Sequence, residues 1–314
     1  MNRKYQHIFG PVPSRRFGRS LGVDLLVPKT CSLDCIFCQL GRSKKKTVDR
    51  REYVPTEDVI AELEMWFSSG VETDVITLSG SGEPTLHCNF GEVLQYIRSK
   101  SNVPVVLLTN GTMLHLPEVR KGAAVASIVK VSLSVWDQAS YRWINRPHEN
   151  LAFESLVEGE CKFREEFNGE LFLEVFLVKG INSLPEDVEK IAAVARLIRP
   201  DRIQLNTAVR PPAEGFVEPL SREELEELAG LFEPQAEIIA EFGGKQARNI
   251  KANEQAILSM LERRPCTAEQ IAEVFDMNLN EVSKYLGKLM DDHLIEPEKR
   301  NLSLYYRATP GDKQ

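Results

Sequence analysis

The sequence predicts an α/β protein whose larger part is an open, partial (β/α)6 TIM-like barrel. Between residues 21 and 207, short apolar runs alternate with segments whose apolar residues recur at helical spacing. This alternation is typical of parallel strands joined by right-handed helical crossovers. About six such units are present, which favours a partial barrel over a closed eightfold one. A doubly wound sheet is the alternative.

The individual elements follow from apolar runs and capping signals. Strands are expected at 21–27, 74–79, 103–109, 127–135, 171–178 and 202–207. Helices are expected at 56–69, 90–100, 152–167 and 185–198, with others after Trp136 and after Ser221. The proline-rich segment 10–16 is expected to be a loop. Active sites of such folds lie at the carboxyl ends of the parallel strands, so the loops there hold the candidate residues.

The composition is that of an ordinary globular protein with a sizeable core. The chain has 314 residues, 42% of them hydrophobic, and a net charge of −7. No apolar run approaches the roughly 18 residues needed to cross a membrane. The first residues lack the apolar stretch of a secretory signal. We therefore expect a soluble, cytoplasmic protein without a membrane partner.

The charge is unevenly distributed along the chain. Residues 1–52 contain 12 Lys and Arg but only four acidic residues, so this segment is +8 and the remainder is −15. A basic patch near strand-end loops is the kind of surface that binds an anionic substrate or partner. The alternative is that these charges are solvated side chains around a loop.

The most distinctive feature is a group of three cysteines, Cys31, Cys35 and Cys38, within eight residues. Thiolates this close together can bind one metal centre. A structural zinc site needs a fourth ligand, and none of the five histidines lies at a finger-like spacing from Cys38. A [4Fe–4S] cluster held by three cysteines has one iron without a protein ligand, and this fits better. The other three cysteines are scattered and are expected to be ordinary buried thiols.

The spacing C-x3-C-x2-C, with the aromatic Phe37 directly before Cys38, resembles the radical S-adenosylmethionine (SAM) superfamily. The resemblance implies that the open iron of a [4Fe–4S] cluster binds the amino and carboxylate groups of SAM. It also implies an external electron donor such as flavodoxin or ferredoxin. Reductive cleavage of SAM would then give a 5′-deoxyadenosyl radical that abstracts hydrogen from a substrate, while the protein binds and orients the reactants.

The resemblance extends to the other strand ends. Gly80, Ser81, Gly82 and Glu83 match the superfamily's glycine-rich motif, in which exposed backbone contacts the methionine amino group. The same resemblance gives the remaining cofactor-binding candidates. These are Asn110 after the third strand, Ser132 or Ser134 at the ribose or carboxylate, Ile181 and Asn182 at the adenine, and Asn206 near the adenine. For each of these the alternative is a satisfied core or turn residue.

A narrower resemblance concerns the segment 10–22 together with residues 82–86. These resemble a subgroup grouped with wyosine-type tRNA-modifying enzymes. Those enzymes build a tricyclic base from a methylated guanosine and pyruvate, and typically use a second cluster or an amine partner. No cysteine precedes Cys31, so upstream ligands for a second cluster are missing. Wyosine-like tRNA base modification is therefore an alternative function.

A change of pattern predicts a linker at 241–249 between a barrel at 1–240 and a small domain at 250–314. Three helices, beginning near 254, 268 and 279, precede two short strands at 293–295 and 303–307 around a polar turn at 297–301. This order resembles a winged helix-turn-helix. Residues 249–314 contain nine basic and eleven acidic residues, which favours protein contact, dimerisation or substrate presentation over nucleic-acid binding. The alternative from another class is an iron–sulfur redox sensor that regulates transcription by binding DNA through this domain.

Overall fold

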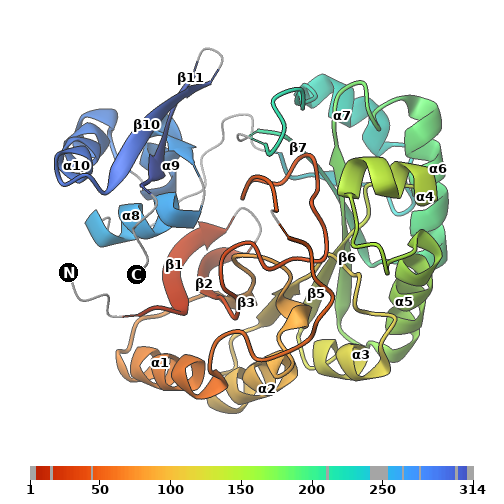
Figure 1. Ribbon diagram of the computed structural model, residues 1–314, viewed down its shortest axis with the longest axis horizontal. Coiled ribbons are helices and arrows are strands. Elements are labelled where there is room, and N and C mark those ends of the chain that lie inside the picture. The colour runs from red at the N-terminus through yellow and green to blue at the C-terminus, as the bar shows by residue number, and fades with distance from the viewer. Residues whose placement is uncertain are drawn as a thin grey trace.

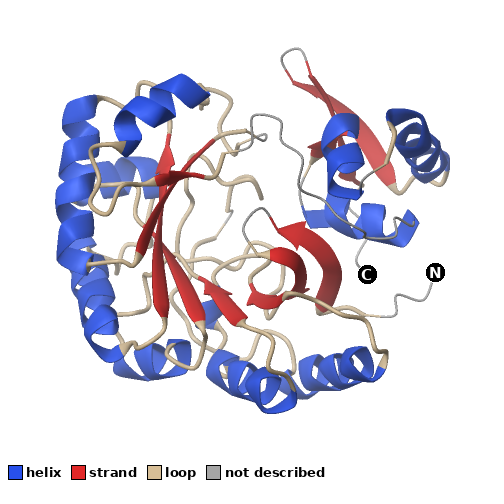
Figure 2. Cartoon of the chain, turned by 180° about the vertical axis from the view of Figure 1, so that it is seen from behind, coloured by secondary structure: helices blue, strands red, loops and turns tan. Residues whose placement is uncertain are grey.

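The computed structural model describes residues 5–14, 17–43, 45–209, 212–240, 254–263, 265–275, 277–300 and 303–309. The expected linker at 241–249 lies outside these described residues. The larger part of the chain is a curved sheet with helices along its outer side (Figure 1). Figure 2 shows from behind that the strands lie inside an arc of helices. This is the α/β class that the sequence predicts.

The sheet has eight strands, and their spatial order is the chain order. They are β1 (Ile8–Ser14), β2 (Gly18–Val23), β3 (Val75–Leu78), β4 (Val105–Leu108), β5 (Ile128–Ser132), β6 (Glu170–Leu177), β7 (Arg202–Thr207) and β8 (Glu237–Ile238). β1 is antiparallel to β2, and every later neighbouring pair is parallel. An unbroken chain order means that each crossover steps the same way, which curls the sheet into an open barrel. The doubly wound alternative is wrong, because its strand order would reverse partway.

The helices of this part cover one face of the sheet. They are α1 (Thr56–Ser68), α2 (Phe90–Lys100), α3 (Pro117–Ala123), α4 (Gln138–Ser140), α5 (Phe153–Glu166), α6 (Pro185–Ile198) and α7 (Arg222–Ala229), with short turns η1 (Pro84–Leu86) and η2 (Tyr141–Asn145). α2 has the predicted bounds. α7 begins after Ser221, as predicted, and its first turn contains a capping box, because Ser221 Oγ accepts from Glu224 N and the Glu224 carboxylate accepts from Ser221 N.

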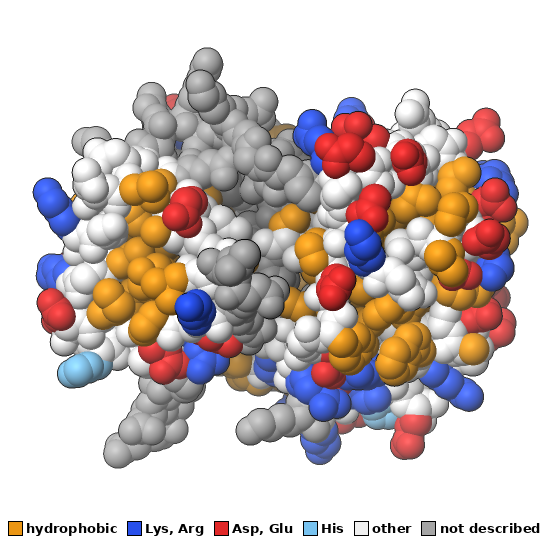
Figure 3. Space-filling view, turned by 90° about the horizontal axis from the view of Figure 1, so that it is seen from above, with side chains coloured by type: hydrophobic (Ala, Val, Ile, Leu, Met, Phe, Trp, Pro, Cys, Tyr) orange, Lys and Arg blue, Asp and Glu red, His pale blue; other side chains and the backbone are white. Residues whose placement is uncertain are grey.

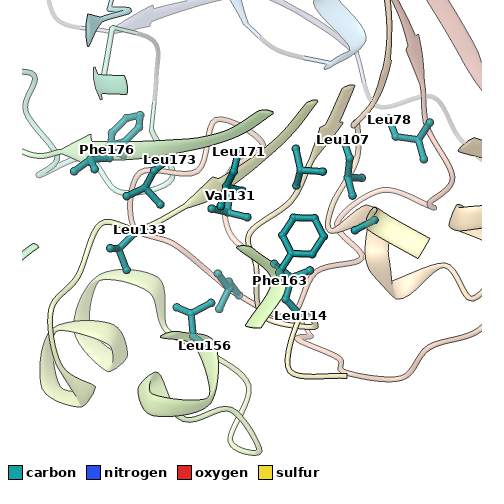
Figure 4. Packing of buried hydrophobic residues seen from close by; sticks show 14 of the residues in the cluster. Leu78, Leu107, Leu114, Val131, Leu133, Leu156, Phe163, Leu171, Leu173 and Phe176 are labelled. Carbon is teal, nitrogen blue, oxygen red and sulfur yellow. The ribbon is translucent and has the colours of Figure 1, made fainter. Parts of the chain in front are cut away.

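The core lies between the sheet and these helices. Side chains of alternate strand residues, such as Val131 on β5 and Leu173 on β6, face Leu156 and Phe163 of α5 (Figure 4). Leu173 and Phe163 are completely buried. The sequence neighbours of Val131 and Leu173 face the concave side of the sheet, because side chains alternate along a strand. We call this concave side the lumen.

The first hairpin differs from the prediction. Residues expected to form a loop are strand β1, which pairs with β2 from Ile8↔Val23 to Ser14↔Gly18. The pairing register shifts between Phe9 and Val12, so the strand contains a bulge. Proline is tolerated here because β1 is an edge strand and one side of it needs no backbone donor.

The C-terminal region has a hydrophobic core of its own. It contains α8 (Glu254–Arg263), β9 (Cys266–Thr267), α9 (Ala268–Phe275), α10 (Leu279–Asp291), β10 (Ile295–Arg300) and β11 (Ser303–Ala308). The strands form a separate antiparallel sheet in the order β10-β11-β9, and α8 and α9 contact β1. Residues 297–300, expected in a turn, belong to β10, where Pro297 pairs with Tyr306. The rest of that turn lies outside the described residues.

Among the helices that the structure describes, none is both long enough and apolar enough to cross a membrane.

Candidate functional site

The segment that carries the three cysteines lies at the carboxyl end of the parallel sheet and is held by η2. Asp34 N donates to Asn145 O at 3.0 Å, and Ile36 N donates to Ile144 O at 2.9 Å. His148 N donates to Ser32 O at 2.8 Å. The π-helical turn therefore fixes the backbone between the cysteines, and such turns are frequent at functional sites.

Side-chain amides donate toward two of the three sulfurs. Asn145 Nδ2 lies 3.1 Å from Cys35 Sγ, and Asn110 Nδ2 lies 3.6 Å from Cys31 Sγ. Asn110 is itself oriented by Thr112, whose backbone N–H and hydroxyl both donate to Asn110 Oδ1. N–H groups aimed at sulfur stabilise thiolate charge, as ligands of a metal cluster require.

The surroundings of the thiols keep them protonated when no metal is bound. Burial raises the pKa of Cys31 to about 12, and the nearby Glu83 carboxylate acts in the same direction. Burial also raises the pKa of Cys35 well above its ordinary value. The pKa of Cys38 is raised by burial too, and the Lys29 ammonium opposes that rise. A metal that binds these sulfurs must displace their protons, so loading depends on pH.

The donor set fits a cluster better than a single ion. In the described part of the chain, no group of three His, Cys, Asp or Glu side chains converges closely enough to hold one metal ion. A zinc site needs four ligands around one point, whereas each thiolate of a [4Fe–4S] cluster binds a different iron. The loop holds three free thiols, and side-chain N–H groups donate to two of the three sulfurs. This arrangement suits a [4Fe–4S] cluster.

The glycine-rich loop that follows β3 lies directly against the start of the cysteine loop. Lys29 N donates to Ser81 O at 2.7 Å, and Glu83 N donates to Thr30 O at 2.9 Å. A Cβ added to Gly82 would lie 1.7 Å from Thr30 O, so only glycine allows this approach. The cysteine loop and the glycine-rich loop, which the resemblance assigns to one cofactor site, are thus joined by hydrogen bonds.

Asp24 holds the other side of the glycine-rich loop. Its carboxylate accepts from Ser81 Oγ at 2.6 Å and from Ser81 N at 3.1 Å. Gly80 has φ +137°, and a Cβ there would lie 2.3 Å from Asp24 Cγ. Gly80 and Gly82 are therefore both required, because Asp24 and the Thr30 carbonyl lie too close to the glycine-rich loop for a Cβ at either position. A loop without these two side chains allows a ligand to approach its backbone.

The Glu83 side chain is buried in the protein beneath the glycine-rich loop. Its carboxylate accepts from the hydroxyls of Thr85 and Thr109, each at 2.6 Å, and from Asn110 N at 2.6 Å. Burial raises its pKa, and these hydrogen bonds oppose the rise. The side chain thus joins the ends of β3 and β4, which positions Asn110 beside Cys31.

The remaining candidate residues lie at the ends of β5, β6 and β7. Ser134 Oγ accepts from Phe176 N, while Asn182 accepts from Val178 N and donates to Ser134 O and Phe176 O. These two side chains are buried and fasten strand ends, so their cofactor roles stay predictions. Ser132 and Ile181 are half-buried at the same edge.

Several residues of this site escape sequence reasoning. Asn145 lies 110 positions from Cys35, and no local pattern marks it. Phe176 stacks on Phe37 with ring centroids 4.2 Å apart, so the aromatic residue before Cys38 packs the cysteine loop against β6. Lys29 Nζ donates to Gly41 O across the base of the cysteine loop. Cys88, expected to be buried, is exposed.

A cavity of about 290 Å³ lies between this site and the C-terminal region. The barrel contributes Lys29, Gly41, Gly80 and Ser81 to its wall, and the C-terminal region contributes Leu261, Glu262, Glu298 and Arg307. The cavity therefore reaches the glycine-rich loop from outside the barrel.

The basic N-terminal segment has fewer available charges than its composition indicates. Arg19 pairs with Asp74, Arg50 with Glu118, and Arg42 with Glu214. Lys46 Nζ donates to Pro147 O. Residues 1–4, 15, 16 and 44 lie outside the described residues. Figure 3 shows acidic and basic side chains interspersed over one face of the molecule.

The fold and the site define a protein class, and comparison with known proteins identifies it. Residues 25–195 match the family model of the Radical SAM superfamily. The chain belongs to this superfamily. A protein named UPF0026 protein from Helicobacter pylori (strain 26695) is 32% identical over 307 residues, covering 96% of this chain and 97% of that protein. The chain is thus also similar to the group that carries the UPF0026 name.

Other relatives share only part of their length. A protein named GTPase Obg from Brachyspira hyodysenteriae is 34% identical over 307 residues, but the chain spans only 45% of it. Among solved structures, a radical SAM methyltransferase from Sphaerobacter thermophilus matches with a TM-score of 0.53 and 16% identity, over 71% of this chain and 67% of that one. Streptococcus suis SuiB bound to S-adenosylmethionine matches with a TM-score of 0.51 and 14% identity, over 71% of this chain and 51% of that one. These two similarities establish the fold.

Proposed function

We propose that this protein is a radical SAM enzyme that holds a [4Fe–4S] cluster on Cys31, Cys35 and Cys38. SAM would bind the cluster's open position and the backbone of Gly80–Glu83. Cys31, Cys35 and Cys38 would hold the cluster, and reduction by an external donor such as flavodoxin or ferredoxin would supply the one electron needed to cleave SAM into methionine and a 5′-deoxyadenosyl radical. The observation that best supports this proposal is the direct hydrogen bonding between the cysteine loop and the glycine-rich loop. Lys29 N donates to Ser81 O, and Glu83 N donates to Thr30 O.

The chain's own residues have distinct tasks in this proposal. Asn110 and Asn145 orient and stabilise the thiolates of Cys31 and Cys35. Asp24 keeps the glycine-rich loop in place through Ser81. The Phe37–Phe176 stack closes one side of the loop and limits the access of water.

The test is anaerobic reconstitution with iron and sulfide, followed by dithionite and SAM. We expect about four irons per chain, as a [4Fe–4S] cluster requires, and release of 5′-deoxyadenosine. Cys35→Ala should abolish the cluster spectrum, while the exposed Cys88→Ala is the matched control and should keep it. A redox sensor without catalysis would show an intact cluster and no 5′-deoxyadenosine, and that result would refute the enzyme.

We also propose that the C-terminal region is a winged helix-like module that presents substrate to the barrel. The cavity that it shares with the glycine-rich loop supports this role. Nucleic-acid binding is the less supported alternative, since Lys288 on α10 is paired with Glu254 on α8. The test is a mobility-shift titration with duplex DNA and with unfractionated tRNA at 150 mM salt. We expect no complex, and a salt-sensitive complex with tRNA would favour wyosine-like tRNA modification.

A further inference from the structure

Two large aromatic side chains are exposed beside the cysteine loop. Trp143 of η2 is 53% exposed, and Phe216, in the segment after β7, is 48% exposed. Their rings are parallel, with an interplanar angle of 3° and centroids 6.0 Å apart. Aromatic side chains are enriched at the centres of protein–protein interfaces, because each of them removes a large apolar area from water when a partner covers it.

Both aromatic residues belong to segments that hydrogen-bond to the backbone between the second and third cysteines. Ile36 N donates to Ile144 O at 2.9 Å, directly after Trp143. Glu214 N donates to Ile36 O at 3.1 Å, two residues before Phe216. The aromatic pair therefore marks a part of the protein surface that is connected directly to the cysteine loop.

Positive charge is concentrated in the segments that meet at this part of the surface. Segments 42–47, 141–149 and 214–216 contain six Lys and Arg and two acidic residues, so they are +4, while the whole chain is −7 and the remainder is therefore −11. The first segment lies beside the second, because Lys46 Nζ donates to Pro147 O at 2.8 Å. The charge of this surface is thus opposite to that of the rest of the chain.

The cations of these segments form two groups. Arg42 and Arg146 both pair with the Glu214 carboxylate, at 3.4 Å and 2.5 Å, which joins the third segment to the other two. Lys45 and Arg142 are exposed, and neither forms an ion pair with another residue that the structure describes. The second group is therefore available to a partner, and Arg42 is itself 64% exposed.

The combination of an apolar centre and a cationic rim restricts the kind of partner. It is complementary to a protein surface with an acidic rim. Because the remainder of this chain is strongly negative, an acidic partner is repelled from other faces and steered to this one. Nucleic acid is less suited, since Arg42 and Arg146 are already paired with a carboxylate and few cations are left for phosphates.

We propose that this surface docks a small acidic protein that delivers one electron to the cluster. The donor is oxidised by one electron, the oxidised cluster is reduced by one, and no bond forms or breaks. The inference rests on the proposed radical SAM function, which requires an external donor. We call the following residues the donor surface: Arg42, Lys45, Arg142, Trp143, Arg146 and Phe216.

The donor surface is separate from the cavity that the C-terminal region lines. The described residues in the wall of that cavity include none of the donor surface. A docked donor and a substrate presented through the cavity therefore occupy different places, so the two proposals are compatible.

The test measures how fast the cluster is reduced, with SAM absent. The full chain, with its cluster reconstituted, is mixed in a stopped-flow instrument with a reduced, acidic flavodoxin, and the change of the cluster's visible absorbance gives the second-order rate constant. We expect this rate constant to fall at least ~10-fold between about 50 mM and about 500 mM NaCl, because salt screens the attraction between opposite charges. The rate with dithionite, a small reductant that needs no docking surface, is the reference for each variant.

Two double variants test the two parts of the donor surface. Trp143→Ser with Phe216→Ser removes the apolar centre and should lower the flavodoxin rate constant at least ~10-fold. Lys45→Glu with Arg142→Glu reverses the charge of the rim and should lower it at least ~10-fold at the lower salt concentration, with a smaller loss at the higher one. Neither variant should change the rate with dithionite.

Matched control variants lie on the outer helices. Leu184→Ser with Leu197→Ser removes two apolar side chains at α6 that are 55% and 63% exposed. Lys121→Glu with Arg196→Glu reverses two exposed cations on α3 and α6. Both controls should keep the flavodoxin rate constant.

Four outcomes would overturn the inference. These are an unchanged flavodoxin rate in both surface variants, an equal loss in a control variant, an equal loss with dithionite, and a mobility-shift complex with unfractionated tRNA that the Lys45→Glu, Arg142→Glu variant loses. The third would mean that these residues only support the cluster site, and the last would assign the surface to nucleic acid. Failure of the proposed function is distinguishable, because it appears as a missing cluster, or as missing 5′-deoxyadenosine with dithionite, where no protein donor takes part.

Discussion

The two sides of the same strands differ in chemistry. On the side that faces the helices, Leu171, Leu173 and Val131 are completely buried among other apolar side chains. On the lumen side, Lys130 and Glu174 form an ion pair, and the strands end in the hydrogen-bonded loops of the cysteine site. The residues that stabilise the fold and the polar residues therefore lie on opposite faces of the sheet. Substitutions on each face should therefore have separable effects.

The largest effect on ligand binding is expected at the mouth of the lumen, from Gly82→Ala. The added Cβ would lie 1.7 Å from Thr30 O, so the glycine-rich loop must move away from the cysteine loop. We expect SAM binding to weaken at least ~100-fold, about 2.7 kcal/mol, while the fold persists. Equilibrium dialysis with SAM measures this. Gly215→Ala is the control, since its Cβ would meet nothing.

On the helix-facing side, Leu173→Ala should act on stability instead. Leu173 is completely buried, so the substitution leaves a cavity and should cost about 3–4 kcal/mol of the free energy of unfolding. Ser132→Ala, on the lumen side of the neighbouring strand, should change it by less than about 0.5 kcal/mol. Urea denaturation of both variants measures the contrast. Equal losses would remove the distinction between the faces.

A smaller effect is expected from Asn145→Leu. The Asn145 amide donates to Cys35 Sγ, and a donor to thiolate sulfur favours the reduced, more negative cluster. Its removal should lower the midpoint potential by about 60 mV or less, since 1.4 kcal/mol corresponds to 59 mV for one electron. A redox titration followed by electron paramagnetic resonance measures the shift. A rise in potential would contradict the assigned role of this amide.

The smallest effect concerns the metal-free protein. The raised pKa values of Cys31 and Cys35 mean that their thiolates form only at pH values above the ordinary range. At pH 8 iodoacetamide should therefore label the exposed Cys88 about tenfold faster or more, because the thiolate is the nucleophile. Labelling of Cys31 should accelerate as the pH rises toward 12. Peptide mapping by mass spectrometry gives both rates. Equal labelling of Cys88 and Cys31 at pH 8 would contradict the burial of the Cys31 thiol.

The sequence predicts the architecture well where local signals suffice. Apolar runs locate the strands. α2, α7 and α9 begin where the sequence indicates, and reciprocal side-chain to backbone hydrogen bonds cap the starts of α7 and α9. Two short elements escape prediction because their partners are distant. β1 is stabilised by its pairing with β2 despite its prolines, and β8 is two residues long and depends on β7.

The candidate site is predictable only in part. The spacing of Cys31, Cys35 and Cys38 and the neighbouring glycines can be read from the chain itself. The positions of Asn145 and Phe176 beside the cysteine loop depend on how distant segments meet. The ion pair of Lys130 with Glu174 likewise requires knowledge of strand register, since the two residues belong to different strands.

In the proposed function, SAM binds directly to a cluster held by the cysteine loop. The most direct measurement is the electron paramagnetic resonance spectrum of the reduced, reconstituted protein before and after SAM is added. We predict a clear change of the cluster signal with SAM, and no such change in Gly82→Ala although its cluster is intact. An identical spectrum with and without SAM, at full iron content, would contradict the claim.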